Sequence, residues 1–144
     1  MVDYILGDRG SVEIVTDGYY EAETLQVFEE LHIDRERIWF GEDHLVPEPD
    51  NPYEPKSIAV YIDELKVGRM SVKYSAAYWE PITPVVASGY VPVVHLQLSA
   101  IARRVGEGTR IESYGVLSLS APGSLFPINQ APARAALLPQ GQSM

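Results

Sequence analysis

The hydrophobic pattern of the chain is dominated by short segments with the two-residue period of β-strands. In most of them β-branched or aromatic residues alternate with polar ones, and turn-forming residues separate one segment from the next. The segment 57–62 has almost no polar alternation, so burial on both faces is expected there. The predicted strands are residues 11–16, 38–46, 57–62, 65–70, 91–100 and 111–120.

Local irregularities are predicted at two places within these strands. Adjacent Glu42 and Asp43 interrupt the second strand and indicate a bulge or a short break. Asp63 and Glu64 predict a tight turn that joins the third and fourth strands as a hairpin, in which Gly68 marks a bulge or a close backbone approach.

Helical periodicity occurs twice. Over residues 20–32 apolar side chains recur every three or four positions, with glutamates on the opposite side. Ser71 can cap a short helix over residues 72–79 that ends at Pro81, and a further turn is predicted over residues 84–87. Since strands dominate and consecutive strands pair locally, we expect a mainly β (α+β) fold: a small, six-stranded, partly closed β-barrel with two helices at its ends.

The length of 144 residues predicts one domain. We expect residues 1–10 to form a polar N-terminal lead and residues 11–120 to form the barrel. Residues 121–144 are rich in proline and alanine and have no hydrophobic period, so they are expected to be a flexible tail.

The amino-acid composition limits the kinds of functional site that are expected. Cysteine is absent, which is typical of a cytoplasmic protein. His32, His44 and His95 are scattered without the spacing of metal ligands, so neither a metal nor a cofactor is expected. No apolar run approaches the roughly 20 residues of a membrane helix, and residues 1–4 have no features of a secretory signal.

The net charge of −9 is unevenly distributed. Residues 1–64 carry 17 acidic and 4 basic side chains, whereas residues 65–144 carry 3 acidic and 7 basic ones. Bulk attraction to nucleic acid is therefore excluded, because neutralisation of phosphates supplies most non-specific affinity. A local basic binding site is still compatible with this charge distribution, and it is expected in the second half of the chain.

Catalytic motifs are missing from the sequence, including phosphate-binding glycine loops and nucleophile elbows. Adjacent acid pairs do occur, but neighbouring side chains on a helix or strand do not converge on one point. A non-catalytic protein is therefore favoured over a small enzyme.

The most distinctive stretch comprises residues 46–61. Its four prolines fix the backbone and remove hydrogen-bond donors, which predicts a rigid loop directly ahead of a buried strand. Tyr53 lies in this loop, and Tyr19 and Tyr20 lie at the turn before the first helix. Such rings can stack on nucleobases, or they can pack against the protein's own helix and loop. Packing is favoured for Tyr20, and the two interpretations are equal for Tyr19 and Tyr53.

Arg69 lies on the hairpin strand that pairs with the strand leaving this loop. It is therefore expected close to Tyr53. The alternative is a salt bridge to Glu54 or Asp50.

The loop sequence Asn-Pro-Tyr-Glu at residues 51–54, with Ser-Ile-Ala-Val at 57–60 and Val-Gly-Arg-Met at 67–70, resembles the HIRAN domain. Its hallmark is an Asn-Pro-Tyr-Asp segment followed by a Val-Gly hairpin, and Gly-Tyr-Tyr at 18–20 matches the start of the family's first helix. The resemblance covers residues 11–120 and is strongest over 46–70. It implies an OB-like β-barrel and a non-catalytic module that grips single-stranded DNA at its 3′-hydroxyl end.

Carried over by position, Tyr19 and Tyr53 would stack on bases and Tyr20 would line the pocket. Glu54 stands where the family has an aspartate that binds the hydroxyl, and Arg69 would lie near a phosphate. The implied DNA-binding residues are Tyr19, Tyr20, Asn51, Tyr53, Glu54 and Arg69.

A helicase or repair protein is an implied partner, because HIRAN domains occur in helicase-like remodelling proteins and the sequence contains no ATPase motif. Gly18 stands where DNA-binding members carry an arginine, and Glu54 is one methylene longer than aspartate. The alternative function is therefore a protein-interaction or accessory domain that keeps the barrel without binding DNA.

Overall fold

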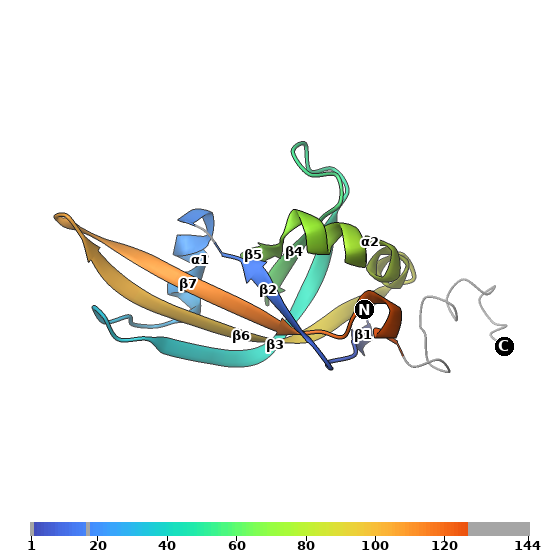
Figure 1. Cartoon of the computed structure of the whole chain (residues 1–144), viewed down its shortest axis with the longest axis horizontal. Coiled ribbons are helices and arrows are strands. Elements are labelled where there is room, and N and C mark those ends of the chain that lie inside the picture. The colour runs from blue at the N-terminus through green and yellow to red at the C-terminus, as the bar shows by residue number, and fades with distance from the viewer. Residues whose placement is uncertain (1, 17, 127–144) are drawn as a thin grey trace, which may run out of the picture.

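The computed structural model describes residues 2–16 and 18–126, and its centre is a closed antiparallel β-barrel (Figure 1). The strands pair in the order β1-β6-β3-β4-β5-β2-β7, and an additional pairing of β6 with β7 closes six of them into a ring. The predicted mainly β fold with six barrel strands and two helices is confirmed, and the barrel is fully closed. The strands are β1 (Val2–Ile5), β2 (Ser11–Val15), β3 (Arg37–Glu48), β4 (Ser57–Ile62), β5 (Leu65–Met70), β6 (Tyr90–Val105) and β7 (Gly108–Ser118).

The predicted β4–β5 hairpin is confirmed, and β4 is buried on both faces at every position except Tyr61, which is half-buried. Asp63 occupies the connecting turn with a φ of 53°. The pairing register shifts between Val60 and Tyr61. At Gly68 an added Cβ would lie 2.7 Å from the carbonyl oxygen of Val15, so glycine is what allows β2 to approach β5 here.

Strand β3 runs through Glu42 and Asp43 without interruption, so the predicted bulge is wrong. Residues 37–44 pair with residues 93–100 of β6 in one continuous register. Asp43 lies on the same side of the strand as buried Leu45 and is only 2% exposed. The long ladder with β6 satisfies the backbone, which outweighs the cost of an acidic side chain directed into the barrel.

The predicted polar lead contains a seventh strand, outside the ring. Strand β1 pairs in parallel with the first residues of β6, from Val2 opposite Tyr90 to Ile5 opposite Val93. Leu6, the next residue, is buried. Four residues are too short a segment for a period to be recognised, which is why the sequence pattern did not indicate this strand.

Part of the predicted tail also packs against the barrel. A 3₁₀ turn spans Pro122–Ser124, and Leu125 after it is 1% exposed. The ring of Phe126 lies edge-on to that of Tyr4, with centroids 5.7 Å apart. Residues 127–144, the remainder of that predicted tail, lie outside the described residues.

The first helix is shorter than predicted. A 3₁₀ turn, Gly18–Tyr20, leads into α1 (Glu21–Val27). Phe28 leaves the helix with an extended backbone and is 3% exposed. Burial of this ring in the core replaces the further helical turns that the period had predicted.

The second helix, α2 (Val72–Ala87), is one continuous element, so its predicted end at Pro81 is wrong. Ser71 caps it as expected, accepting a hydrogen bond of 3.3 Å from the backbone nitrogen of Tyr74. The Tyr78 hydroxyl donates a bond of 2.6 Å to the Ser120 carbonyl. Buried positions continue beyond Pro81 to Val85, and this packing compensates for the backbone bonds that proline removes.

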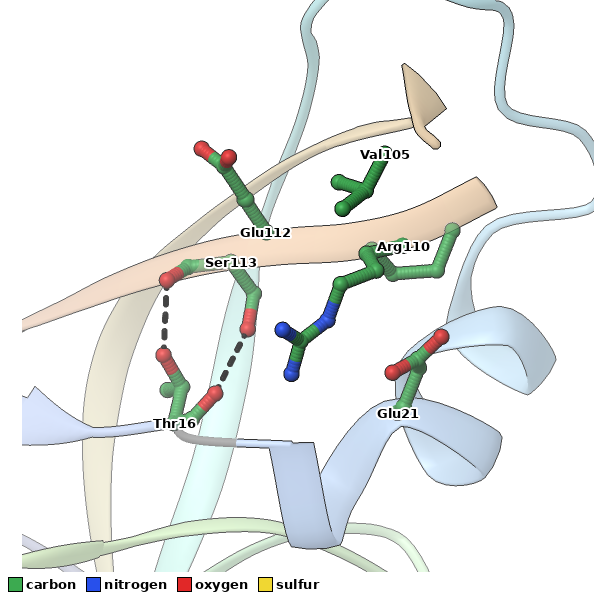
Figure 2. Close-up of a pocket in the computed structure, with 7 residues that line it drawn as sticks. Thr16, Glu21, Val105, Arg110, Glu112 and Ser113 are labelled. Atoms are coloured by element: carbon green, nitrogen blue, oxygen red, sulfur yellow. Dashed lines mark hydrogen bonds between the residues drawn. The ribbon is translucent and has the colours of Figure 1, made fainter. Parts of the chain in front are cut away.

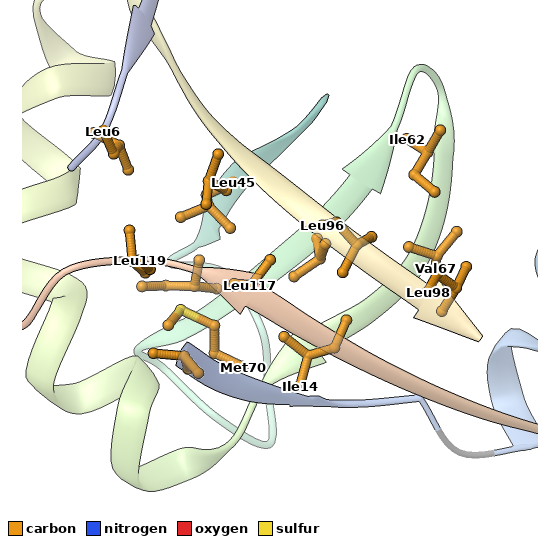
Figure 3. Close-up of a cluster of buried hydrophobic side chains, with 14 of the residues drawn as sticks. Leu6, Ile14, Leu45, Ile62, Val67, Met70, Leu96, Leu98, Leu117 and Leu119 are labelled. Atoms are coloured by element: carbon orange, nitrogen blue, oxygen red, sulfur yellow. The ribbon is translucent and has the colours of Figure 1, made fainter. Parts of the chain in front are cut away.

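The core fills the barrel with aliphatic side chains from every strand of the ring (Figure 3). The two helices lie apart, α1 beside the β6–β7 hairpin and α2 toward the opposite end (Figure 1). Core residues labelled in Figure 3 are Leu6, Ile14, Leu45, Ile62, Val67, Met70, Leu96, Leu98, Leu117 and Leu119.

Candidate functional site

The loop between β3 and β4, residues 49–56, projects from the barrel (Figure 1). Asn51 organises it: its Oδ1 atom accepts hydrogen bonds from the backbone nitrogens of Tyr53 (2.9 Å) and Glu54 (3.0 Å). The Ser57 nitrogen donates to the Glu54 carbonyl at 3.0 Å, which closes the loop where β4 begins. The expected rigidity therefore comes from an asparagine-centred turn as well as from the prolines.

The base of the loop is held by the carboxylate of Glu48. Its Oε1 atom accepts from the Ser57 hydroxyl at 3.0 Å and from the Asn51 amide at 3.4 Å. Its Oε2 atom accepts from Lys66 Nζ at 2.8 Å. Partial burial would raise the pKa of Glu48, but the bonds from Lys66 and Ser57 outweigh it and hold that pKa below its usual range.

Lys66 connects the loop base to the turn before α1. Its Nζ atom lies 5.8 Å from the centroid of the Tyr20 ring. Partial burial would lower the pKa of Lys66, but the bond to Glu48 overcomes this effect and raises it. A charged pair is therefore maintained at neutral pH, and it brings Tyr20 and Asn51 into one polar cluster.

The other two tyrosines project into solvent. Tyr53 is 94% exposed and Tyr19 is 88% exposed, the highest values among the large hydrophobic side chains that the structure describes. Tyr20, in contrast, is half-buried, in keeping with the packing interpretation. Glu54 is also half-buried, and its Oε1 atom accepts from the Lys56 nitrogen at 3.4 Å.

Arg69 faces outward on β5, opposite Ala59 of β4 and Val15 of β2. Ala59 lies two residues beyond Ser57, so the arginine is near the end of the loop along the strand. Within the described part of the chain it forms no salt bridge with Glu54 or Asp50, so the predicted alternative pairing does not form. Its guanidinium is available to an external anion.

Sequence reasoning missed Glu48 and Lys66. The signal for Glu48 is its position between two prolines at the foot of the loop. The signal for Lys66 is a charge at an outward position of the hairpin strand Leu65–Met70, in which Arg69 is the other charged residue. Their pairing depends on the register between β3, β4 and β5, which the sequence pattern does not specify.

Replacing Asn51 with alanine should loosen the loop without unfolding the barrel. Two backbone donors lose their acceptor, and each such bond contributes roughly 0.5–1.5 kcal/mol. We expect hydrogen exchange at the Tyr53 and Glu54 amides to accelerate by roughly two- to tenfold, with unchanged exchange in β6. Asn51→Asp keeps the acceptor oxygen but loses the amide bond to Glu48 and faces its carboxylate, so its exchange should lie between those of the parent and the alanine variant. If the alanine and aspartate variants exchange alike, the turn is held by the prolines alone.

The cavities of the described residues lie elsewhere. A pocket of about 440 Å³ opens between α1 and β7 and is lined by Thr16, Glu21 and Arg110, among others (Figure 2). In the portion of the chain described here, no group of three or more histidine, aspartate or glutamate side chains is arranged to hold a metal ion. No described helix has the length and apolar character needed to cross a membrane.

Comparisons of the chain with family models, with curated proteins and with solved structures give no match. The functional interpretation therefore depends on four features of the structure. Tyr53 is exposed on an ordered loop, Tyr19 is exposed at the turn before α1, Arg69 faces outward on β5, and the partly buried Glu48–Lys66 ion pair holds the base of the loop.

Proposed function

We propose that this protein is a non-catalytic module that binds the 3′ end of single-stranded DNA, with Tyr53 and Tyr19 stacking on bases. The observation that carries the proposal is the combination of a fully exposed Tyr53 ring with a backbone fixed by Asn51. An aromatic ring on a rigid support loses little conformational freedom when a base stacks on it. The resemblance to HIRAN domains supports the same assignment.

The loop also offers a partner for the terminal hydroxyl. A carboxylate has about four acceptor positions. Glu54 uses one oxygen for the Lys56 nitrogen, which leaves acceptor capacity for a 3′-hydroxyl group. Asn51 positions Glu54 through its backbone and Arg69 supplies positive charge beside the loop.

The charge of the protein indicates that stacking, rather than phosphate neutralisation, supplies most of the affinity. Lys66 is already paired with Glu48, and the net charge is −9. We therefore expect a shallow salt dependence, corresponding to one or two phosphate contacts, about 0.7 to 1.4 in the slope of log affinity against log salt.

The test is a titration of the protein into a labelled ten-nucleotide oligothymidylate with either a 3′-hydroxyl or a 3′-phosphate. A 3′-phosphate adds roughly 1.5 to 2 negative charges, here next to the Glu54 carboxylate. We expect it to weaken binding at least tenfold, measured by fluorescence anisotropy at low salt. Equal affinity for the two ends, or no binding to either, would contradict the proposal.

A second candidate function, a protein-interaction or accessory domain, is favoured by the outward face of β3. Phe40 there is 69% exposed and Ile38 is 47% exposed. A helicase or repair protein in the cytoplasm is the partner we propose for this face. Loss of that interaction in Phe40→Ser but not in Tyr53→Ala would assign it to β3, separately from DNA binding.

A further inference from the structure

The pocket between α1 and the β6–β7 hairpin is lined by an exposed arginine, Arg110, that forms no ion pair within the described residues, and by Glu21 and Glu112. Arg110 extends from β7 into this space of about 440 Å³, and Glu21 of α1 lies across from it (Figure 2). Within the residues that the structure describes, the Arg110 side chain forms neither an ion pair nor a hydrogen bond. Although the chain has a net charge of −9, a guanidinium without an ion pair at a pocket is a candidate anion site.

The β6–β7 hairpin places a second arginine beside Arg110. Arg110 pairs directly with Arg103 across the β6–β7 ladder, so two cations share one face. Like charges directly opposite one another destabilise a strand pair. Arg103 is neutralised by Asp34 at 3.0 Å and by Glu112 at 3.7 Å. Within the described residues Arg110 has no carboxylate at ion-pair distance, although Glu21 and Glu112 line the same pocket, so its guanidinium can still accept an external anion.

The wall of the pocket is rigid. Thr16 Oγ1 donates to the Ser113 carbonyl at 2.8 Å, and Ser113 Oγ donates to the Thr16 carbonyl at 2.9 Å (Figure 2). These reciprocal bonds hold the end of β2 against β7 beside Arg110. A ligand would therefore meet a preformed surface.

The turn Gly18–Tyr20 lies in the chain between two residues that line the pocket. Thr16 and Glu21 line it, and Tyr19 lies between them in the chain. A strand whose base stacks on Tyr19 would therefore pass this pocket with its neighbouring nucleotides. Arg110 offers a guanidinium to a phosphate, and Glu21 offers an acceptor to a base or sugar donor.

We infer that the Arg110 pocket binds the phosphodiester of an internal nucleotide of a single strand whose 3′ end is held at Tyr19 and Tyr53. This inference rests on the proposed function. It adds a second contact point, on the hairpin side of the 3₁₀ turn, and it assigns a role to the basic second half of the sequence.

The experiment compares Arg110→Gln with a matched control, Arg104→Gln. Arg104 pairs with Thr109, so it projects from the opposite face of the same hairpin, and its substitution removes the same charge. With the ten-nucleotide 3′-hydroxyl oligothymidylate, we expect Arg110→Gln to weaken binding roughly three- to tenfold and to reduce the salt slope by about 0.7, the value for one single-strand phosphate. Arg104→Gln should bind like the parent protein, and thermal unfolding should show both variants folded.

Three results would overturn the inference, and they are distinguishable. If the parent protein binds in a Tyr53-dependent manner but the two glutamine variants behave alike, the Arg110 site fails while the proposed function stands. If a two-nucleotide oligothymidylate depends on Arg110 as strongly as the longer one, the phosphate lies at the 3′ end and not at an internal nucleotide. If the parent protein binds no oligonucleotide, both the inference and the proposed function fail.

Discussion

Asp43→Asn is expected to make the protein more stable at pH 8 and to flatten the pH dependence of its stability. Asp43 is 2% exposed inside the barrel, and within the described residues neither carboxylate oxygen has a hydrogen-bond partner. Burial raises the pKa of Asp43 to about 8, and its own backbone N–H, which is close but outside hydrogen-bonding geometry, opposes this rise only in part. At neutral pH the side chain is therefore mostly protonated, and at higher pH the fold must hold an unpaired charge.

The direction of the pH dependence follows from the pKa of Asp43 in the unfolded and folded states. Unfolded, the carboxyl titrates near 4; folded, it titrates near 8, so its pKa is raised by folding. The folded state then binds more protons between these values, and stability falls as pH rises from about 4 to about 8. At about 1.4 kcal/mol per unit, the upper limit of the loss is on the order of 5 kcal/mol, a large part of the stability of a domain this size.

The measurement is urea unfolding at a series of pH values between 5 and 9. The free energy of unfolding of the asparagine variant should be nearly constant across this range. Burial of its amide without a partner should lower that free energy by roughly 1–3 kcal/mol at every pH. Asp63→Asn is the matched control: it removes the same charge from the exposed β4–β5 turn, where asparagine tolerates the φ of 53°. A parent protein equally stable at pH 5 and pH 8 would show that Asp43 finds a partner in solution.

Tyr53→Ala is expected to weaken binding to single-stranded DNA strongly while leaving the fold intact. Loss of one base–aromatic stack costs roughly 1–3 kcal/mol, which corresponds to about a 5- to 150-fold loss of affinity. Because the ring is 94% exposed, its removal creates no cavity and should not change the unfolding midpoint. Affinity is measured by anisotropy and stability by urea unfolding of the same samples.

Tyr53→Phe separates the ring from its hydroxyl. It keeps the stacking surface and should bind within about threefold of the parent, since a single neutral hydrogen bond contributes roughly 0.5–1.5 kcal/mol. Unchanged binding by the alanine variant would remove Tyr53 from the site. A loss of equal size in both variants would indicate that the hydroxyl, and not the ring face, contacts the DNA.

The barrel strands were predictable because each one is indicated by the residues within it. Alternation of side chains identifies strands, and the buried run before Tyr61 identifies a strand covered on both faces. The helix ends were not predictable, because packing determines them. Phe28 leaves its helix to enter the core, and α2 continues through Pro81 because Tyr78 and Val85 are both buried on one face.

The candidate site was predictable to the extent that it is one loop. Prolines and Asn51 indicate an ordered segment, and the structure adds the bonds that order it. The sequence pattern does not predict the contacts that join separate strands. Glu48 of β3 and Lys66 of β5 form an ion pair only because β4 lies between the two strands and fixes their register. Arg110 was overlooked for the same reason, because the tertiary structure determines which described residues lie within ion-pair distance of its side chain.

The position of β2 in the ring has a consequence for how the chain folds. β2 closes the barrel by pairing with β7, so that Ser11 lies opposite Ser118. The β4–β5 and β6–β7 hairpins join neighbouring segments and can form early, whereas the β2–β7 ladder must first overcome the entropy of closing a loop of about a hundred residues. We therefore expect closure by β2 to be the late, slow step of folding, and expect an open five-stranded sheet with its core exposed to precede it.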